Sequence, residues 1–133
     1  MRVAAGGNAR APFMQIHILK SKIHRATVTA ADMHYEGSIT IAVDFMQKAG
    51  LYPYERVLCS NLANGDRFET YVIPGERGSR SVVLNGATAH LGKIGDRLTI
   101  MSYTVVEEAI AKNWQPRVLL LDEQNNIINE RGI

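Results

Sequence analysis

The sequence RVLCSNLANGDRFETYVI, residues 56–73, carries the clearest structural signal in the chain. Two strand-like runs, 56–62 and 67–73, flank the dipeptide Asn64-Gly65. Asn-Gly between two such runs is the strongest short-range signal for a β-hairpin. The stretch therefore predicts two antiparallel strands joined by a turn.

Similar short runs, separated by turn residues, lie on both sides of this hairpin. They span residues 15–19, 26–29, 39–41, 81–84, 98–105 and 118–121. Helical signals are fewer. They comprise a short helix over 45–49 with Asp44 as its N-cap and Gly50 at its end, one turn over 87–91 and a helical stretch over 106–114. Many short strands with few helices favour a small, mostly β fold closed into a barrel.

The composition is that of a single globular domain. The chain has 133 residues, and 46% of them are hydrophobic, which is enough to build a core. The net charge of +2 arises from interspersed basic and acidic residues, so no basic patch indicates a nucleic-acid partner. No apolar stretch is long enough to span a membrane. The single cysteine, Cys59, lies in an apolar run, which predicts a buried unreactive thiol and fits a reducing cytoplasm.

The two ends of the chain differ from the middle. Residues 1–13 lack the apolar segment of a secretory signal, and they predict a disordered extension or a segment upstream of a natural start at Met14. Residues 123–133 predict a polar tail that frays. The folded domain is therefore expected over residues 14–122.

Familiar catalytic motifs are absent. The sequence contains no P-loop, no Gly-rich dinucleotide-binding fingerprint after a strand and no GxSxG elbow. The four histidines lack the spacing of metal ligands. His17, His34 and His90 are interpreted as ordinary surface or core residues, whereas for His24 the structural and functional interpretations balance.

The segment DMHYEGSIT, residues 32–40, is the exception. Taken alone, Gly37-Ser38 between two strand-like runs predicts an ordinary turn. The segment nevertheless resembles the self-cleavage site of the bacterial aspartate 1-decarboxylases, and four further stretches resemble blocks of that family in the same order. They are KSKIHRATVT (20–29), NGDRFETY (64–71), ERGSR (76–80) and NGATAH (85–90). The resemblance runs from about residue 14 to about residue 118, and it implies a double-psi β-barrel.

The resemblance implies that the chain cuts itself between Gly37 and Ser38. A serine hydroxyl can attack the preceding carbonyl and convert the amide into an ester, and a glycine, lacking a Cβ, lets it approach. β-Elimination then gives dehydroalanine, and hydrolysis releases ammonia and leaves a pyruvoyl group at the new N-terminus. This covalent group, derived from Ser38, is the implied cofactor, with no metal and no pyridoxal phosphate. It forms a Schiff base with L-aspartate and accepts the electrons that CO2 leaves behind.

Further roles are implied by matching the family's motifs residue by residue. Tyr71 matches the acid that protonates the product carbon. Substrate contacts are implied for Arg67, Lys22, His24, Thr70 and the backbone of Gly86-Ala87-Thr88. Thr70 also matches the threonine that helps the acyl shift, and Tyr35 and Asn85 are expected to support the cleavage loop. Arg67 is the strongest candidate for holding a carboxylate, because a guanidinium binds it bidentately. Without the family match, Tyr71 would be interpreted as a buried strand tyrosine, and Lys22 with His24 as a solvated strand edge.

Strand parity raises a problem in residues 67–73. Arg67 and Tyr71 share one face of a regular strand, and Thr70 points to the other. A bulge or a strong twist could aim both faces at one pocket. Alternatively, the two faces could serve different copies of the chain. The homotetramer that the resemblance implies, with sites at subunit boundaries, favours the second explanation.

The implied function is decarboxylation of L-aspartate to β-alanine for pantothenate synthesis, and whether a helper protein assists maturation is left open. The alternative is a non-enzymatic binding module in which Gly37-Ser38 is a plain turn. The joint presence of Ser38, Lys22 and the 67–71 motif favours the enzyme. The chain departs from the family at Ala30, where histidine is frequent, at Thr88, where many members have alanine, and before residue 14, which has no family counterpart.

Overall fold

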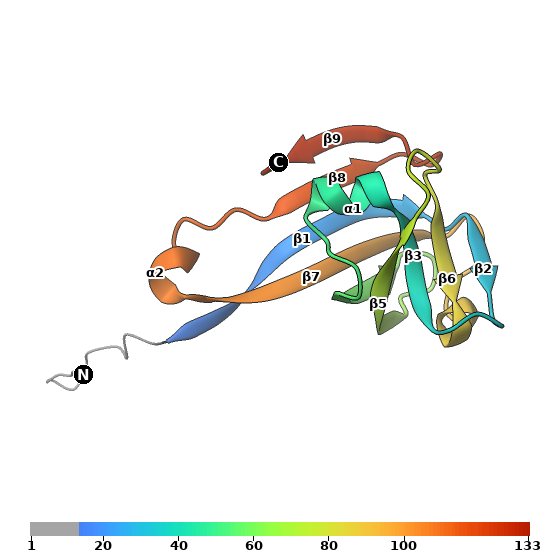
Figure 1. Cartoon of the computed structure of the whole chain (residues 1–133), viewed down its shortest axis with the longest axis horizontal. Coiled ribbons are helices and arrows are strands. Elements are labelled where there is room, and N and C mark those ends of the chain that lie inside the picture. Colours follow the sequence, from blue (N-terminus) through green and yellow to red (C-terminus); the bar gives the residue numbers. More distant parts are fainter. Residues whose placement is uncertain (1–13) are drawn as a thin grey trace, which may run out of the picture.

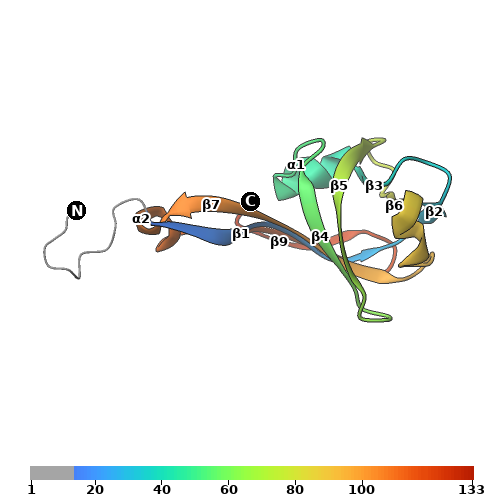
Figure 2. The same ribbon diagram turned by 90° about the horizontal axis from the view of Figure 1, so that it is seen from below.

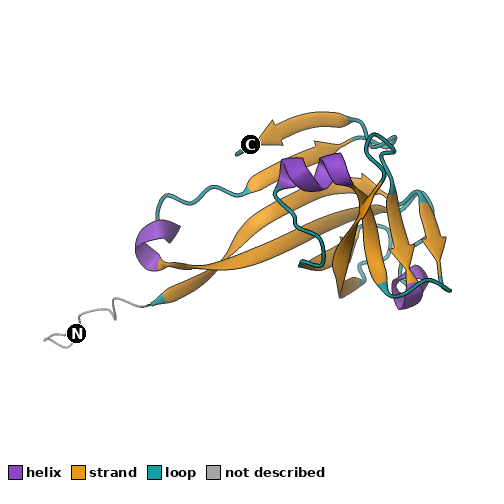
Figure 3. Cartoon of the chain, in the orientation of Figure 1, coloured by secondary structure: helices purple, strands orange, loops and turns teal. Residues whose placement is uncertain are grey.

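A computed structural model describes residues 14–133, so the expectation for residues 1–13 lies outside the described chain. Strands dominate it (Figures 1 and 3). They are β1 (Gln15–Thr27), β2 (Ala30–Asp32), β3 (Ser38–Ala42), β4 (Arg56–Asn61), β5 (Arg67–Gly75), β6 (Val82–Asn85), β7 (Arg97–Glu107), β8 (Arg117–Leu121) and β9 (Ile127–Arg131). The helices are α1 (Val43–Ala49), α2 (Glu108–Ala111) and the 3₁₀ helix η2 (Gly86–His90).

The strands form one mixed sheet in the order β2-β6-β3-β5-β4-β7-β1-β8-β9. Three neighbouring pairs are parallel, namely β1–β8, β2–β6 and β3–β5. The core draws large buried side chains from several strands and from α1, including Ile23, Ile39, Phe45, Leu84, Ile100 and Leu119. The mostly β, barrel-like fold is thus confirmed, and so is the hairpin of β4 and β5, whose strands pair antiparallel without a register shift.

The first strand is longer than the sequence predicts. Separate strands are expected over 15–19 and 26–29, but β1 continues from residue 15 to residue 27. Its register with β7 shifts twice, and Arg25, at the second shift, has a φ of 64°. Bulges of this kind bend a strand without ending it, so the pattern of side chains is interrupted while the backbone pairing continues.

The ends of α1 agree with the sequence only in part. The prediction of Asp44 as the N-cap is wrong, because Ala42 occupies that position and Asp44 lies in the first turn. The Asp44 carboxylate instead accepts a hydrogen bond of 3.0 Å from the backbone N–H of Gly78, in the β5–β6 loop. The predicted end at Gly50 is confirmed, since its φ of 77° is the left-handed conformation that glycine adopts at helix ends.

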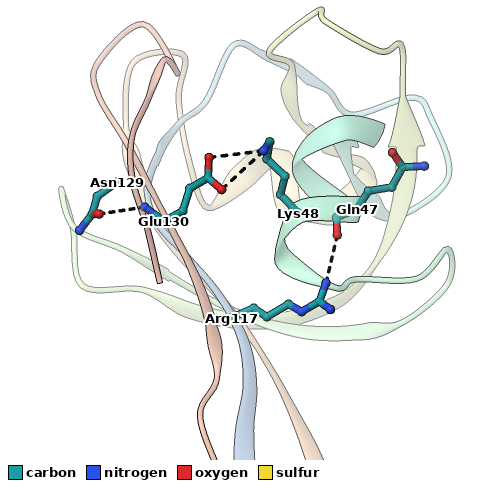
Figure 4. Close-up of polar contacts among 5 residues, drawn as sticks. All are labelled: Gln47, Lys48, Arg117, Asn129 and Glu130. Atoms are coloured by element: carbon teal, nitrogen blue, oxygen red, sulfur yellow. Dashed lines mark hydrogen bonds and ion pairs between the residues drawn. The ribbon is translucent and has the colours of Figure 1, made fainter. Parts of the chain in front are cut away.

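The C-terminal residues form a strand, so the expectation of a fraying tail is wrong. β9 pairs antiparallel with β8. The buried side chain of Asn125 accepts a hydrogen bond of 2.7 Å from the Thr27 N–H and donates one of 2.9 Å to the Thr27 carbonyl. Lys48 of α1 lies 3.4 Å from the carboxylate of Glu130 in β9 (Figure 4). These long-range polar contacts order a segment that has little apolar patterning.

Beyond the barrel, β1 and β7 continue as a two-stranded ribbon. Residues 15–19 pair with residues 103–107, and the ribbon leads to α2 at the far end of the molecule (Figure 2). α2 is shorter than the predicted 106–114, because Val106 and Glu107 still belong to β7. After α2, Trp114 donates from Nε1 to the Leu19 carbonyl at 2.7 Å, which leads the chain back toward the barrel.

Candidate active site

Ser38 lies where an exposed loop enters the core. Residues 33–37 are exposed, whereas Ser38 opens β3 and is only 1% exposed. Its Oγ donates a hydrogen bond of 3.1 Å to the Glu36 carbonyl and accepts one of 3.0 Å from Nδ2 of Asn85. The hydroxyl next to the Gly37–Ser38 bond is therefore buried and held from two sides.

Asn85 connects two hydroxyl groups on one face of β3. It ends β6 directly opposite Ser38 in the antiparallel β3–β6 pair. Its Nδ2 also donates a hydrogen bond of 2.9 Å to Oγ1 of Thr40. Sequence reasoning missed Thr40, although strand alternation places it two residues from Ser38 on the same face and could have revealed it.

Gly86 packs directly against Gly37, the residue that precedes the bond expected to break. Its φ is 64°, and a Cβ at this position would lie 2.7 Å from Cα of Gly37 and 3.1 Å from the carbonyl oxygen of Tyr35. Gly37 itself has no left-handed φ, and a Cβ there would meet nothing within 4 Å. Packing in the uncut chain therefore requires glycine at 86 and not at 37.

Thr88 completes this corner from inside η2, where it is 6% exposed. Its Oγ1 lies 2.8 Å from the carbonyl oxygen of Asn85 and 3.4 Å from that of Ser38. The neighbouring Ala87 is exposed. We call the group formed by Gly37, Ser38, Thr40, Asn85, Gly86 and Thr88 the Ser38 corner. The backbone carbonyl oxygen of Tyr35 lies close to this corner, whereas the residue as a whole is 52% exposed.

Tyr71 lies on the strand beside Ser38. In the parallel β3–β5 pair, Ile39 is opposite Val72, and the residues that precede them are Ser38 and Tyr71. The Tyr71 ring is half-buried, and its centroid lies 6.2 Å from that of Tyr54. No hydrogen bond to the Tyr71 hydroxyl is found within residues 14–133.

Arg67 and Thr70 retain the parity conflict that the sequence raises. β4 and β5 pair in unbroken register from Arg56–Tyr71 to Ser60–Arg67, so no bulge in this pair turns Thr70 toward the Tyr71 face. Arg67 is exposed at the start of β5 and forms no ion pair in the described part of the chain. One chain therefore does not explain how both faces of β5 would serve a single site.

Lys22 and His24 lie apart from the Ser38 corner. They belong to β1, which is separated from β3 in the sheet by β5, β4 and β7. Burial, followed by the positive charges of Lys22 and Arg25, lowers the pKa of His24. Among the described residues, the buried Nδ1 of His24 has no hydrogen-bond partner. Within residues 14–133, the Lys22 ammonium group has no ion-pair partner and His24 Nδ1 has no hydrogen-bond partner, so both could bind another group.

The remaining structural features offer no competing chemistry within the described residues. Burial raises the pKa of the Cys59 thiol to about 12, which confirms an unreactive cysteine. No three His, Cys, Asp or Glu side chains in residues 14–133 are grouped to hold a metal ion. No helix in that range is long and apolar enough to cross a membrane.

A hollow of about 640 Å³ lies between α1 and the segment that follows α2. Met46, Tyr52 and Trp114 are among the residues that line it, together with Lys20 and Arg117. None of the predicted site residues lines it. We therefore place the candidate site at the Ser38 corner, where a buried hydroxyl and specific donors converge, rather than in this hollow.

Comparisons with known proteins point to one group. A family model described as "Aspartate decarboxylase" matches residues 14–128. The chain is 52% identical over 113 residues to an "Aspartate 1-decarboxylase" of Chlorobium chlorochromatii, covering 85% of this chain and 88% of that one. A protein of the same name from Chloroherpeton thalassium is 54% identical over 112 residues (84% and 82%), and one from Leptospira biflexa is 52% identical over 113 residues (84% and 96%).

Proposed function

The chain belongs to the aspartate decarboxylase family, and on that premise we propose that it is the precursor of a pyruvoyl-dependent enzyme that converts L-aspartate to β-alanine and CO2. The β-alanine would serve pantothenate synthesis. The observation that carries the proposal is the buried Ser38 hydroxyl, held by Asn85 and the Glu36 carbonyl beside the Gly37–Ser38 bond. The buried, unpaired Cys59 fits a cytoplasmic location.

The Ser38 corner fits the group that maturation would generate. A pyruvoyl group at position 38 carries a ketone and an amide carbonyl, both hydrogen-bond acceptors. Asn85 Nδ2 already donates a hydrogen bond to Ser38 Oγ, and Thr88 Oγ1 lies 3.4 Å from the Ser38 carbonyl oxygen. The group would supply the electron sink that loss of CO2 requires. Asn85 would then hold and orient residue 38, and the close approach of Gly86 would limit the space beside it.

Tyr71 is proposed as the proton donor to the product carbon. Its place on β5 beside Ser38 and its hydroxyl, unpaired within residues 14–133, support that role. Arg67, Lys22 and His24 are proposed to hold the substrate carboxylates. Thr70 and the backbone of residues 86–88 are proposed to complete the contacts. Arg67 and Lys22 make no ion pair in the described chain, so both charges are available to an anionic ligand.

The site is proposed to be shared between copies in a homotetramer. Three strands separate Lys22 and His24 from Ser38, and β5 presents Thr70 and Tyr71 on opposite faces. The ribbon of β1 and β7 adds support, because an isolated two-stranded ribbon is at best marginally stable in water. Its exposed Tyr103 and Val105 offer apolar surface to another copy.

The proposal is tested on purified protein by intact mass spectrometry and by assay of β-alanine. We expect a fragment that ends at Gly37, a second that begins with a pyruvoyl-blocked residue 38, and product formation from L-aspartate. A chain that stays uncut and inactive would support the non-enzymatic binding module instead.

The shared site is tested by co-expressing two inactive chains, one with Ser38→Ala and one with Lys22→Ala. The first lacks the cofactor and the second lacks a cation. If Lys22 of one copy serves Ser38 of another, mixed assemblies regain activity. Mixed assemblies, verified by mass, that remain inactive would place both groups in the same chain.

A further inference from the structure

The Thr88 hydroxyl lies within reach of two carbonyl oxygens but has one proton to donate. The contact with Asn85 O is 2.8 Å and that with Ser38 O is 3.4 Å. The shorter contact takes the proton in the uncut chain, and the Ser38 carbonyl remains the second acceptor. The side-chain amide of Asn85 is already committed, because its Nδ2 donates its two hydrogens to Ser38 Oγ and Thr40 Oγ1.

The Ser38 carbonyl gains charge in one step of the proposed maturation. After the acyl shift, Oγ of Ser38 carries the Gly37 acyl group as an ester. Elimination transfers the Cα proton of Ser38 to water and breaks the Cβ–Oγ bond, whose electron pair leaves with the Gly37 carboxylate. As the Cα–H bond breaks, negative charge spreads onto the Ser38 carbonyl oxygen. A charged oxygen accepts hydrogen bonds that are shorter and roughly twice as strong.

We propose that Thr88 Oγ1 is the donor that stabilises this charge, so that Thr88 is a catalytic residue of self-maturation; the assignment rests on the proposed function. The Thr88 hydroxyl donates to Asn85 O in the uncut chain, and it turns to donate to Ser38 O when that oxygen becomes the stronger acceptor. The change needs only rotation about the Cβ–Oγ1 bond of Thr88 and a small approach of Thr88 Oγ1 to Ser38 O from 3.4 Å. The hydroxyl is buried, so few water molecules compete with it.

The size of the side chain at position 88 matters as well as its hydroxyl group. An alanine leaves space in which a water molecule can donate instead, whereas valine fills the space and donates nothing. Three variants therefore separate the hydroxyl from the volume: Thr88→Ser keeps the donor, Thr88→Ala makes room for water, and Thr88→Val removes both.

The test follows maturation of freshly purified uncut protein over time. Samples are treated with hydroxylamine, which cleaves the ester but not the amide, and the masses of the fragments are measured by mass spectrometry. We expect Thr88→Ser to mature like the parent, Thr88→Ala more slowly, and Thr88→Val roughly 10- to 100-fold more slowly, with the ester accumulating. Deuterium at Cα of Ser38 should slow Thr88→Val further, because breaking the Cα–H bond then limits its rate.

Two outcomes would overturn the assignment of Thr88. One is Thr88→Val maturing at the parental rate. The other is Thr88→Val stalling as a hydroxylamine-resistant amide, which would place the defect before the ester. If Thr88→Val does not fold, Thr88→Ser and Thr88→Ala decide, and equal rates for these two would count against the donor. If the unsubstituted protein never matures, the proposed function and the assignment of Thr88 both fail. If it does mature, the variants test the assignment of Thr88 alone.

Discussion

The Ser38 corner and the part of β1 that carries Lys22 and His24 differ in how fully their polar groups are paired. In the Ser38 corner, the hydroxyls of Ser38 and Thr88 and the amide of Asn85 all bind partners from the same chain. On β1, Nδ1 of His24 is buried without a partner, and Lys22 forms no ion pair within residues 14–133. A polar group that is buried without a hydrogen-bond partner costs free energy of folding. This part of β1 therefore leaves hydrogen-bonding capacity unused, whereas these three side chains of the Ser38 corner have partners.

The difference separates two tasks. Self-cleavage acts on groups that one chain already holds together, so we expect it to proceed without the substrate-binding cations. Under the proposed function, turnover needs those cations near residue 38, whereas β5, β4 and β7 separate β1 from β3 within one chain. Variants of the Ser38 corner should therefore affect maturation, and variants of β1 and of the exposed face of β5 should affect catalysis alone.

The largest effect is expected for Ser38→Ala. No hydroxyl remains to attack the Gly37 carbonyl, so the chain should stay uncut and form no β-alanine. Denaturing electrophoresis and intact mass measure the cut, and product assay measures activity. If the Ser38→Ala chain still decarboxylates aspartate, the proposed mechanism is wrong.

Tyr71→Phe should separate building the cofactor from using it. The change removes only the phenolic hydroxyl, which has no hydrogen bond within residues 14–133, so processing should be normal. Turnover should fall by about 10²- to 10⁴-fold, the usual contribution of a positioned acid. Mass spectrometry measures processing and steady-state kinetics measure turnover. Uncut protein, or full activity, would reassign Tyr71 to a structural role.

Gly86→Ala tests the close packing in the Ser38 corner, and Gly65→Ala is its matched control. Both glycines have a left-handed φ, 64° and 78°, but only at 86 would a Cβ collide with Gly37. The backbone penalty of alanine is thus common to both. Gly86→Ala should lose about 1–3 kcal/mol more in the free energy of unfolding, the usual cost of overpacking.

This comparison is made by urea unfolding in a Ser38→Ala background, so that both chains remain uncut. In the self-cleaving background, Gly86→Ala should also slow maturation while Gly65→Ala should not. Equal losses of stability for the two variants would show that the contact between Gly86 and Gly37 yields without cost.

Local signals explain which parts of the molecule could be predicted from the sequence. The β4–β5 hairpin and the end of α1 at Gly50 depend on turn residues a few positions apart, and both were predicted. β9 depends on Asn125, whose partner Thr27 lies 98 positions away, so no local pattern announces it.

The candidate site shows the same division. Family motifs identify Ser38 and Asn85 although they are 47 residues apart. Motifs do not reveal that Asn85 also binds Thr40, or that Gly86 packs on Gly37, because both contacts exist only after β3 and β6 have paired. The separation of β1 from β3 likewise depends on the order of strands in the sheet, which spacing in the sequence does not encode.

The smallest effect is expected for Arg67→Lys, and it concerns which carboxylate of aspartate is held. One carboxylate must leave as neutral CO2, so a strong cation on it would stabilise the ground state and oppose the reaction. The bidentate hydrogen bonds should therefore be made to the carboxylate that is retained in the product. We assign them to Arg67, which is exposed and forms no ion pair within residues 14–133. Lysine keeps the charge but loses the planar fork.

Arg67→Lys should therefore raise KM for aspartate by about tenfold, the loss expected when one charged hydrogen bond is removed. Self-cleavage should continue, since the acyl shift involves no substrate carboxylate. The measurement is steady-state kinetics of the fully processed variant, with Arg117→Lys on β8 as the control for exchanging an exposed arginine. Alanine, which lacks the side-chain carboxylate, should react poorly with the parent and lose little more with the variant. Parental KM and turnover for aspartate in Arg67→Lys would remove Arg67 from the site and leave Lys22 and His24 as the carboxylate-binding groups.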